Sequence, residues 1–202
     1  EDLSHVYVIL DAAGRSGNPA LQDPRVRSAI LHAIDREQIR VSLSRGGAES
    51  LALDRVCFPQ QADCPEGANP LPYDPDMARR LLAEAGYPNG FNLTISTLMP
   101  TQEISQAVAG YLRAVGITAS VETLAIAAYR QARAEGRMEM QTSFWTHGGM
   151  PDAGYALKFL FGVPSQDYSG LPRLRELSDI ANRTIGEERM TLLREAYDLM
   201  QD

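Results

Sequence analysis

Polar and hydrophobic positions follow two different periods along the chain, and each period predicts one kind of element. Short runs that alternate, or that consist of apolar and β-branched residues, are typical of strands. They predict four strands, at residues 5–11, 91–98, 117–124 and 138–145. Elsewhere apolar residues recur every three or four positions, which is the pattern of a helix with one buried face.

Helix starts are marked by side chains that can accept a hydrogen bond from the first free backbone N–H groups. The predicted capping residues are Asp23, Asp35, Asp74, Thr101 and Asp152. Further helices are expected near residues 126–135, 174–180 and 190–200, and a long loop rich in proline at 54–73. In the middle of the chain helices and strands alternate, which predicts an α/β fold: a largely parallel or mixed sheet with helices on both faces.

Composition and charge narrow the class of protein. The chain has 202 residues, 44% of them hydrophobic and 22% charged, and a formal net charge of −7. An acidic surface argues against nucleic acid as a partner, because nucleic-acid binding needs a basic patch. We expect a monomer that needs neither metal nor cofactor to fold, and no apolar run reaches the roughly 18 residues of a membrane span.

Two cysteines, Cys57 and Cys64, lie in the sequence CFPQQADC. Their spacing differs from the C-x-x-C pairs of zinc and redox sites. It suits a small disulfide-closed loop in an oxidising compartment, and the alternative is a pair of free thiols.

Enzyme signatures are absent from the sequence. The stretch at residues 14–18 departs from G-x-S-x-G at its last position, and there is no glycine-rich phosphate loop. The three histidines, His5, His32 and His147, share no spacing that would build a metal site. The sequence therefore predicts no catalytic residue.

The stretch SFWTHGGMPDAG, at the end of the last predicted strand, holds the candidate site. Ligands of open α/β sheets bind beyond the carboxyl ends of the strands. There Trp145 offers an apolar face, Thr146 and His147 offer polar groups, and Gly148 lets a ligand approach the backbone. The alternative interpretation is that Trp145 belongs to the core and that the glycines only make a turn.

Four segments, in order, resemble one known family. LQDPRVRSAILHAIDREQI and YDPDMARRLLAEAGYPNGFNLTI are similar to two blocks of the family 5 extracellular solute-binding proteins, the periplasmic receptors of peptide, nickel and related ABC importers. AVAGYLRAVGITASVE and GEERMTLLREAYDLMQD resemble two later segments of the same family. The resemblance covers nearly the whole chain.

The resemblance implies the role of residues 1–202. They would form a single type II periplasmic-binding-protein-like lobe, the second ligand-binding lobe of a longer two-lobed receptor. Such a receptor is periplasmic or lipid-anchored, binds a small solute between its lobes and delivers it to an ABC permease. The expected function is binding and not catalysis.

The resemblance also implies which residues meet the solute. In peptide-binding relatives an Asp three residues after the tryptophan pairs with the peptide's amino group, whereas here Gly148 stands three residues after Trp145. Tyr168 lies in QDYSGLP, which resembles the family's N-Y-S-G-[YF] turn. The predicted ligand-binding set is Trp145, Thr146, His147, Gly148 and Tyr168.

The identity of the solute stays open at this stage. An oligopeptide, a modified peptide, an opine-like or sugar-like compound and a metal chelate all fit the resemblance. Two other functions also stay open: a sensory lobe that passes its closed state to a signalling partner, and a small α/β hydrolase that uses His147.

Overall fold

The structure of the chain is a computed structural model that describes residues 4–43, 53, 55–66, 71–146 and 152–200. In chain order its helices and strands are β1 (Ser4–Leu10), η1 (Pro19–Gln22), α1 (Pro24–Ala33), α2 (Arg36–Leu43), α3 (Pro75–Glu84), β2 (Asn92–Leu98), η3 (Met99–Thr101), α4 (Gln102–Ala114), β3 (Thr118–Leu124), α5 (Ile126–Ala134), β4 (Met140–Thr146), α6 (Gly154–Phe161), α7 (Pro172–Ala181) and α8 (Gly186–Leu199). Each observed strand differs from its predicted range by no more than two residues at either end.

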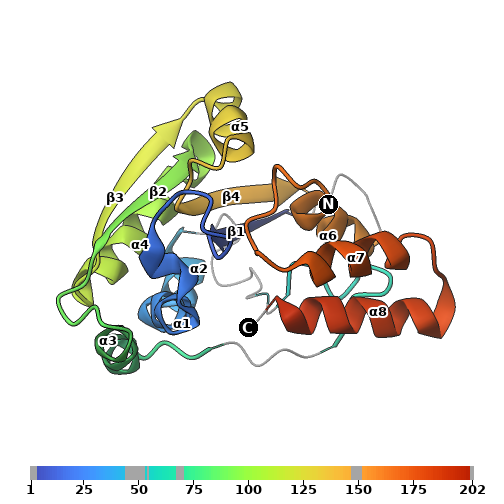
Figure 1. Ribbon diagram of the computed structural model, residues 1–202, viewed down its shortest axis with the longest axis horizontal. Coiled ribbons are helices and arrows are strands. Elements are labelled where there is room, and N and C mark those ends of the chain that lie inside the picture. Colours follow the sequence, from blue (N-terminus) through green and yellow to red (C-terminus); the bar gives the residue numbers. More distant parts are fainter. Residues whose placement is uncertain (1–3, 44–52, 54, 67–70, 147–151, 201–202) are drawn as a thin grey trace.

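The four strands form one mixed sheet in the order β1-β4-β2-β3 (Figure 1). β2 pairs with β3 and with β4 in parallel, and β1 pairs antiparallel with β4 at the edge. Since β3 and β4 lie on opposite sides of β2, right-handed crossovers put α4 and α5 on opposite faces. The α/β prediction with a mixed sheet is confirmed.

Each face of the sheet is covered by its own group of helices. On one face Leu93, Ile95 and Met140 pack with α1, α3 and α4 in the larger core. On the other face the strand β1 contributes Tyr7 and Ile9 to the core made by α6, α7 and α8, which lie together on the right of Figure 1. Successive side chains of β1 therefore serve different cores, with Val8 and Leu10 in the first and Tyr7 and Ile9 in the second, as the pleat of a strand requires.

Three of the predicted helix caps are confirmed. Asp23 accepts a hydrogen bond from the Arg25 N–H at 2.8 Å, and Asp35 accepts one from the Gln38 N–H at 2.8 Å. Asp74 likewise accepts from the N–H of Met77 at 2.8 Å. These interactions are local in sequence, which is why residue type and spacing predict them.

Two predicted caps are wrong in detail. The hydroxyl of Thr101 forms hydrogen bonds with the Thr97 hydroxyl, at 2.9 Å, and with the Leu98 carbonyl, at 3.2 Å, and gives α4 no side-chain cap. Asp152 does accept from the Gly154 N–H, at 2.7 Å, but Ala153 occupies the capping position of α6. In both cases a tertiary neighbour also contacts the side chain: the Thr101 hydroxyl donates to the Thr142 carbonyl at 3.4 Å, and the Asp152 carboxylate pairs with Arg189.

The buried hydroxyl of Tyr129 in α5 makes the free energy of unfolding depend on pH in the alkaline range. Its side chain is 4% exposed, and burial, with a contribution from Tyr7, raises the pKa of its hydroxyl to about 12. A pKa raised on folding gives stability that is complete below about pH 10, the unfolded pKa, and that is lost as pH rises towards 12. By pH 11 the loss from this group is about 1.4 kcal/mol.

We therefore expect the free energy of unfolding to fall between pH 9 and pH 11, and to fall less in the Tyr129→Phe variant. Urea titrations at several pH values measure both slopes. Equal slopes for the two proteins would show that Tyr129 does not titrate in this way.

Candidate solute-binding site

The start of β1 and the end of β4 meet at one end of the sheet, called here the strand tip. The antiparallel register pairs Ser4 with Thr146 and His5 with Trp145. Directly opposed residues of an antiparallel pair share a face, so His5 and Trp145 lie on the same side of the sheet. Thr146 is exposed and Trp145 is partly buried, so both can be reached from solvent.

Two rings of α6 hold the Trp145 indole. The Phe159 ring centroid lies 3.9 Å from that of Trp145, and the Tyr155 centroid lies 5.6 Å away. Tyr155 and Phe159 are four residues apart and so share one face of the helix. Tyr155 is 36% exposed and Trp145 and Phe159 are partly buried, so the three rings form an aromatic surface that solvent reaches in part.

His5 pairs with Trp145 in the strand register and Phe58 contacts His5, and no local sequence pattern singles out either residue. The His5 ring centroid is 5.6 Å from Phe58 and 5.7 Å from Tyr7. Phe58 is 6% exposed and comes from the loop that carries the cysteines. The strand register brings His5 opposite Trp145, and the position of the loop brings Phe58 to His5. Neither can be read from local sequence pattern.

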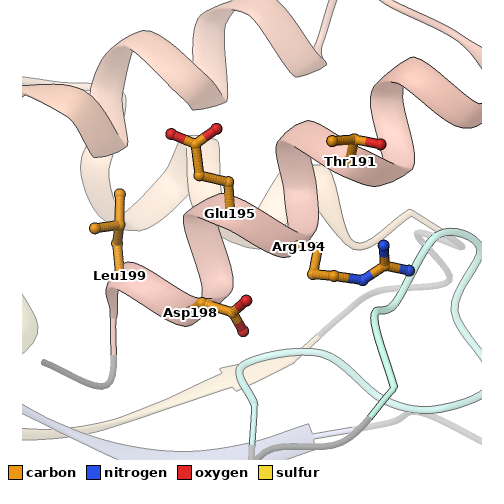
Figure 2. Close-up of a pocket in the computed structure, with 5 residues that line it drawn as sticks. All are labelled: Thr191, Arg194, Glu195, Asp198 and Leu199. Atoms are coloured by element: carbon orange, nitrogen blue, oxygen red, sulfur yellow. The ribbon is translucent and has the colours of Figure 1, made fainter.

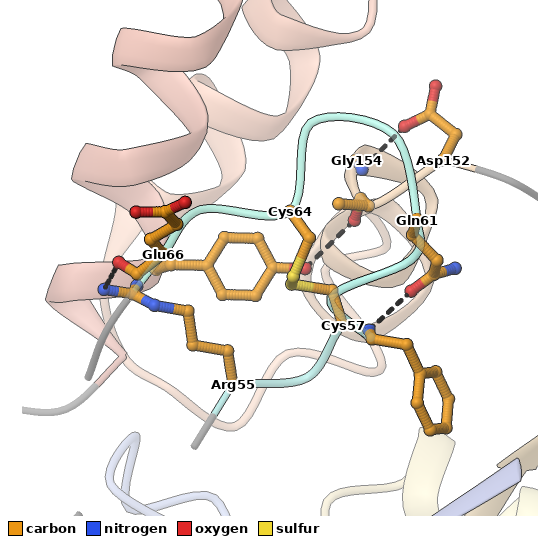
Figure 3. Close-up of a disulfide and its surroundings, with 10 residues drawn as sticks. Arg55, Cys57, Gln61, Cys64, Glu66, Asp152 and Gly154 are labelled. Carbon is orange, nitrogen blue, oxygen red and sulfur yellow. Dashed lines mark hydrogen bonds between the residues drawn. A yellow bond between two sulfur atoms is a disulfide. The ribbon is translucent and has the colours of Figure 1, made fainter. Parts of the chain in front are cut away.

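The cysteine loop is closed by a disulfide between Cys57 and Cys64 (Figure 3). Inside it the Gln61 side-chain oxygen accepts from the Phe58 N–H at 2.9 Å, and the Gln61 N–H donates to the Phe58 carbonyl at 2.9 Å. The sequence left open whether the two cysteines are bonded or free, and in the structure they form the disulfide. The two hydrogen bonds between Gln61 and Phe58 fix the backbone of the loop where Phe58 contacts His5.

The remaining predicted ligand-binding residues fall into two groups. His147 and Gly148 lie outside the described residues. Tyr168 is 1% exposed, its hydroxyl donates to the Arg133 carbonyl at 2.9 Å, and the Arg15 guanidinium lies 4.5 Å from its ring centroid. Because both the ring and the hydroxyl of Tyr168 are engaged inside the protein, we leave it out of the site proposed below.

A shallow hollow lies on α8 (Figure 2). It is lined by Thr191, Arg194, Glu195, Asp198 and Leu199. Its carboxylates already have cationic partners in the chain, since Glu195 pairs with Arg173 at 2.9 Å and Asp198 with Arg55 at 3.0 Å. This hollow contains no residue of the strand tip, and we assign it no ligand.

The described residues contain neither a metal-binding cluster nor a membrane-spanning helix. There, no group of three or more His, Cys, Asp or Glu side chains is placed to hold a metal ion. Within the described part of the chain, no helix combines the length and the apolar character that crossing a bilayer requires.

Comparison with known proteins identifies the class. Residues 2–167 match the model of the bacterial extracellular solute-binding proteins, family 5, middle region. The chain belongs to this family, and the resemblance found in the sequence is confirmed.

Curated relatives include glutathione-binding proteins called GsiB. That of Pectobacterium atrosepticum is 30% identical over an alignment of 210 residues, which covers 96% of this chain and 39% of the relative. That of Escherichia coli K12 is 35% identical over an alignment of 147 residues, which covers 69% of this chain and 28% of the relative. The chain thus spans at most about two fifths of the length of these relatives.

Solved structures share the fold at lower identity. A dipeptide-binding protein of Pseudoalteromonas in complex with Met-Leu has a TM-score of 0.82 at 21% identity, over 100% of this chain and 42% of its own. NikA of Brucella suis in complex with Fe(III)-EDTA has a TM-score of 0.81 at 19% identity, over 99% of this chain and 45% of its own. These similarities establish the fold of a periplasmic-binding-protein lobe.

Proposed function

We propose that residues 1–202 form one ligand-binding lobe of a longer, two-lobed receptor that serves an ABC importer. The observation that carries the proposal is the aromatic surface at the strand tip, where Trp145 contacts two α6 rings at the carboxyl end of β4. Ligand sites of α/β sheets lie at such strand ends. Membership of a family of solute-binding proteins supports a binding function and not a catalytic one.

A small peptide-like solute is the proposed ligand, with the tripeptide glutathione as the first candidate. Relatives that are 30–35% identical are glutathione-binding proteins. A rigid aromatic surface suits the apolar parts of such a solute, and exposed Thr146 at the same end can hydrogen-bond its polar groups. Gly148 in place of the amine-pairing Asp implies that the free amino group is held differently from that of an ordinary oligopeptide.

The same proposal sets the location and partners of the receptor. It would act outside the cytoplasmic membrane, in the periplasm or attached by a lipid, as a monomer. Closing two lobes around the solute would bury the aromatic surface and create the form that an inner-membrane permease accepts. No cofactor takes part.

The test is calorimetric titration of the full-length receptor with glutathione, S-methylglutathione, Met-Leu and mannopinic acid. We expect glutathione and its S-methyl derivative to bind with Kd in the micromolar range or below. At about 100 times Kd, the bound solute should stabilise the receptor by about 2.7 kcal/mol, seen as a higher Tm. If only mannopinic acid binds, the ligand class is an opine and not a peptide-like solute. If none of the four compounds binds, the proposal is contradicted.

A further inference from the structure

The side chain of Arg189 in α8 joins two segments that are far apart in sequence. Its guanidinium lies 3.1 Å from a carboxylate oxygen of Asp63, in the disulfide loop, and 2.5 Å from one of Asp152, just before α6. The Arg189 side chain is 13% exposed, and the carboxylates of Asp63 and Asp152 are 33% and 40% exposed. One largely buried cation therefore holds two carboxylates, and charge pairs of this kind form strong hydrogen bonds.

Backbone contacts join the same segments. Ala62 and Asp152 form a short parallel bridge, and the Ala153 N–H donates to the Ala62 carbonyl at 3.1 Å. From α8, the Tyr197 hydroxyl donates to the Ala153 carbonyl at 3.0 Å. Figure 3 shows the Asp152 carboxylate with the N–H of Gly154, at the point where α6 begins. The loop, the start of α6 and α8 are thus fixed to one another.

The backbone of Asp63 is itself unusual. Its φ is 61°, and it is the only non-glycine residue in the described part of the chain that has a positive φ. Asp tolerates this left-handed conformation better than most residues, but it persists only where its surroundings hold it. The ring closed by Cys57 and Cys64 contains Asp63, and the ion pair with Arg189 holds its side chain.

Both segments held by Arg189 lead to the strand tip. The disulfide loop carries Phe58, which contacts His5. The start of α6 leads within one turn to Tyr155 and within two turns to Phe159, the rings that contact Trp145. Because a helix moves largely as a rigid unit, fixing residues 152–154 also fixes the positions of Tyr155 and Phe159.

We propose that Arg189 is a positioning residue for the solute site, and that it acts by holding Asp63 and Asp152 together. It does not touch the aromatic surface. It sets the distance between the disulfide loop, which carries Phe58, and α6, which carries Tyr155 and Phe159. This inference rests on the proposed function, because it assumes that the strand tip is where the solute binds.

The test replaces Arg189 by methionine in the full-length receptor and compares it with Arg173→Met. Arg173 of α7 also pairs with two carboxylates, Glu176 and Glu195, each at 2.9 Å, but it contacts neither the disulfide loop nor the start of α6 in the described structure. The probes are S-methylglutathione, which has no thiol to exchange with the disulfide, and Met-Leu. Titrations are done well below the Tm of every variant, so that lost stability cannot appear as lost affinity.

We expect Arg189→Met to raise Kd by about tenfold or more and Arg173→Met to leave it within about twofold. Hydrogen exchange at the Ala153 amide, which donates to the loop, should accelerate only in Arg189→Met. An Arg189→Met receptor with a lower Tm but unchanged Kd and exchange would reduce Arg189 to a purely structural role and overturn the inference.

A milder variant covers the case in which Arg189→Met does not fold. Asp63→Asn keeps a residue that accepts a positive φ but removes one of the two ion pairs. It should raise Kd about threefold and accelerate exchange at Ala153, and no change in either would again contradict the inference. If the wild-type receptor binds neither probe, the proposed solute class fails, whereas unchanged exchange at Ala153 in both variants would refute the positioning role on its own.

Discussion

Replacing Trp145 with alanine is expected to weaken solute binding by about 30- to 1000-fold, the effect of losing an aromatic hot spot worth about 2–4 kcal/mol. The indole is only partly buried and is held by contacts with Tyr155 and Phe159 of α6, so its exposed part keeps a fixed orientation. A rigid aromatic side chain loses little conformational entropy on binding. Calorimetric titration of the full-length receptor with the best solute of the panel measures the change.

Phe144 provides the matched control for this prediction. It is the preceding residue of β4, is 39% exposed and lies on the opposite face of the sheet, where it pairs in register with Val6. Phe144→Ala should leave Kd within about threefold, and Trp145→Phe should restore much of the affinity lost in Trp145→Ala. Equal losses in Phe144→Ala and Trp145→Ala would place the solute elsewhere, or on both faces, and would contradict the assigned site.

The Gly90→Ala substitution is expected to lower the free energy of unfolding by about 3–5 kcal/mol, the sum of backbone strain and overpacking. Gly90 has a φ of 72°, and a Cβ there would lie 1.9 Å from the carbonyl oxygen of Gly116. The two turns that lead into β2 and β3 meet at this point, so neither backbone can move away without disturbing the parallel pairing. Urea unfolding followed by circular dichroism gives the change.

Gly86→Ala separates the two causes. Gly86 ends α3 with a φ of 91°, and a Cβ at this position meets nothing within 4 Å. Only backbone strain remains, and the expected cost is about 1–2 kcal/mol. If both variants lose the same stability, the close approach of Gly90 to Gly116 is not what makes glycine necessary there.

The parts of the site that sequence pattern could identify were those carried by a single segment. Trp145 and Thr146 end an alternating strand, and that position alone indicates a candidate ligand site in an α/β fold. His5 and Phe58 have no such local signal, because His5 meets Trp145 only through the antiparallel register of β1, and Phe58 meets His5 only through the docking of the disulfide loop. Tyr168 shows the opposite case, in which a turn similar to that of the family carries a side chain buried in the core.

The sequence by itself determined the α/β class, the four strands, the Asp23 and Asp74 caps and the family, because each depends on residues close together along the chain. Strand order, the antiparallel edge strand and the double ion pair of Arg189 were decided only by the tertiary structure. The physical reason is the same in each case. Short-range periodicity sets which face of an element is buried, but which distant element covers that face depends on the packing of the whole chain.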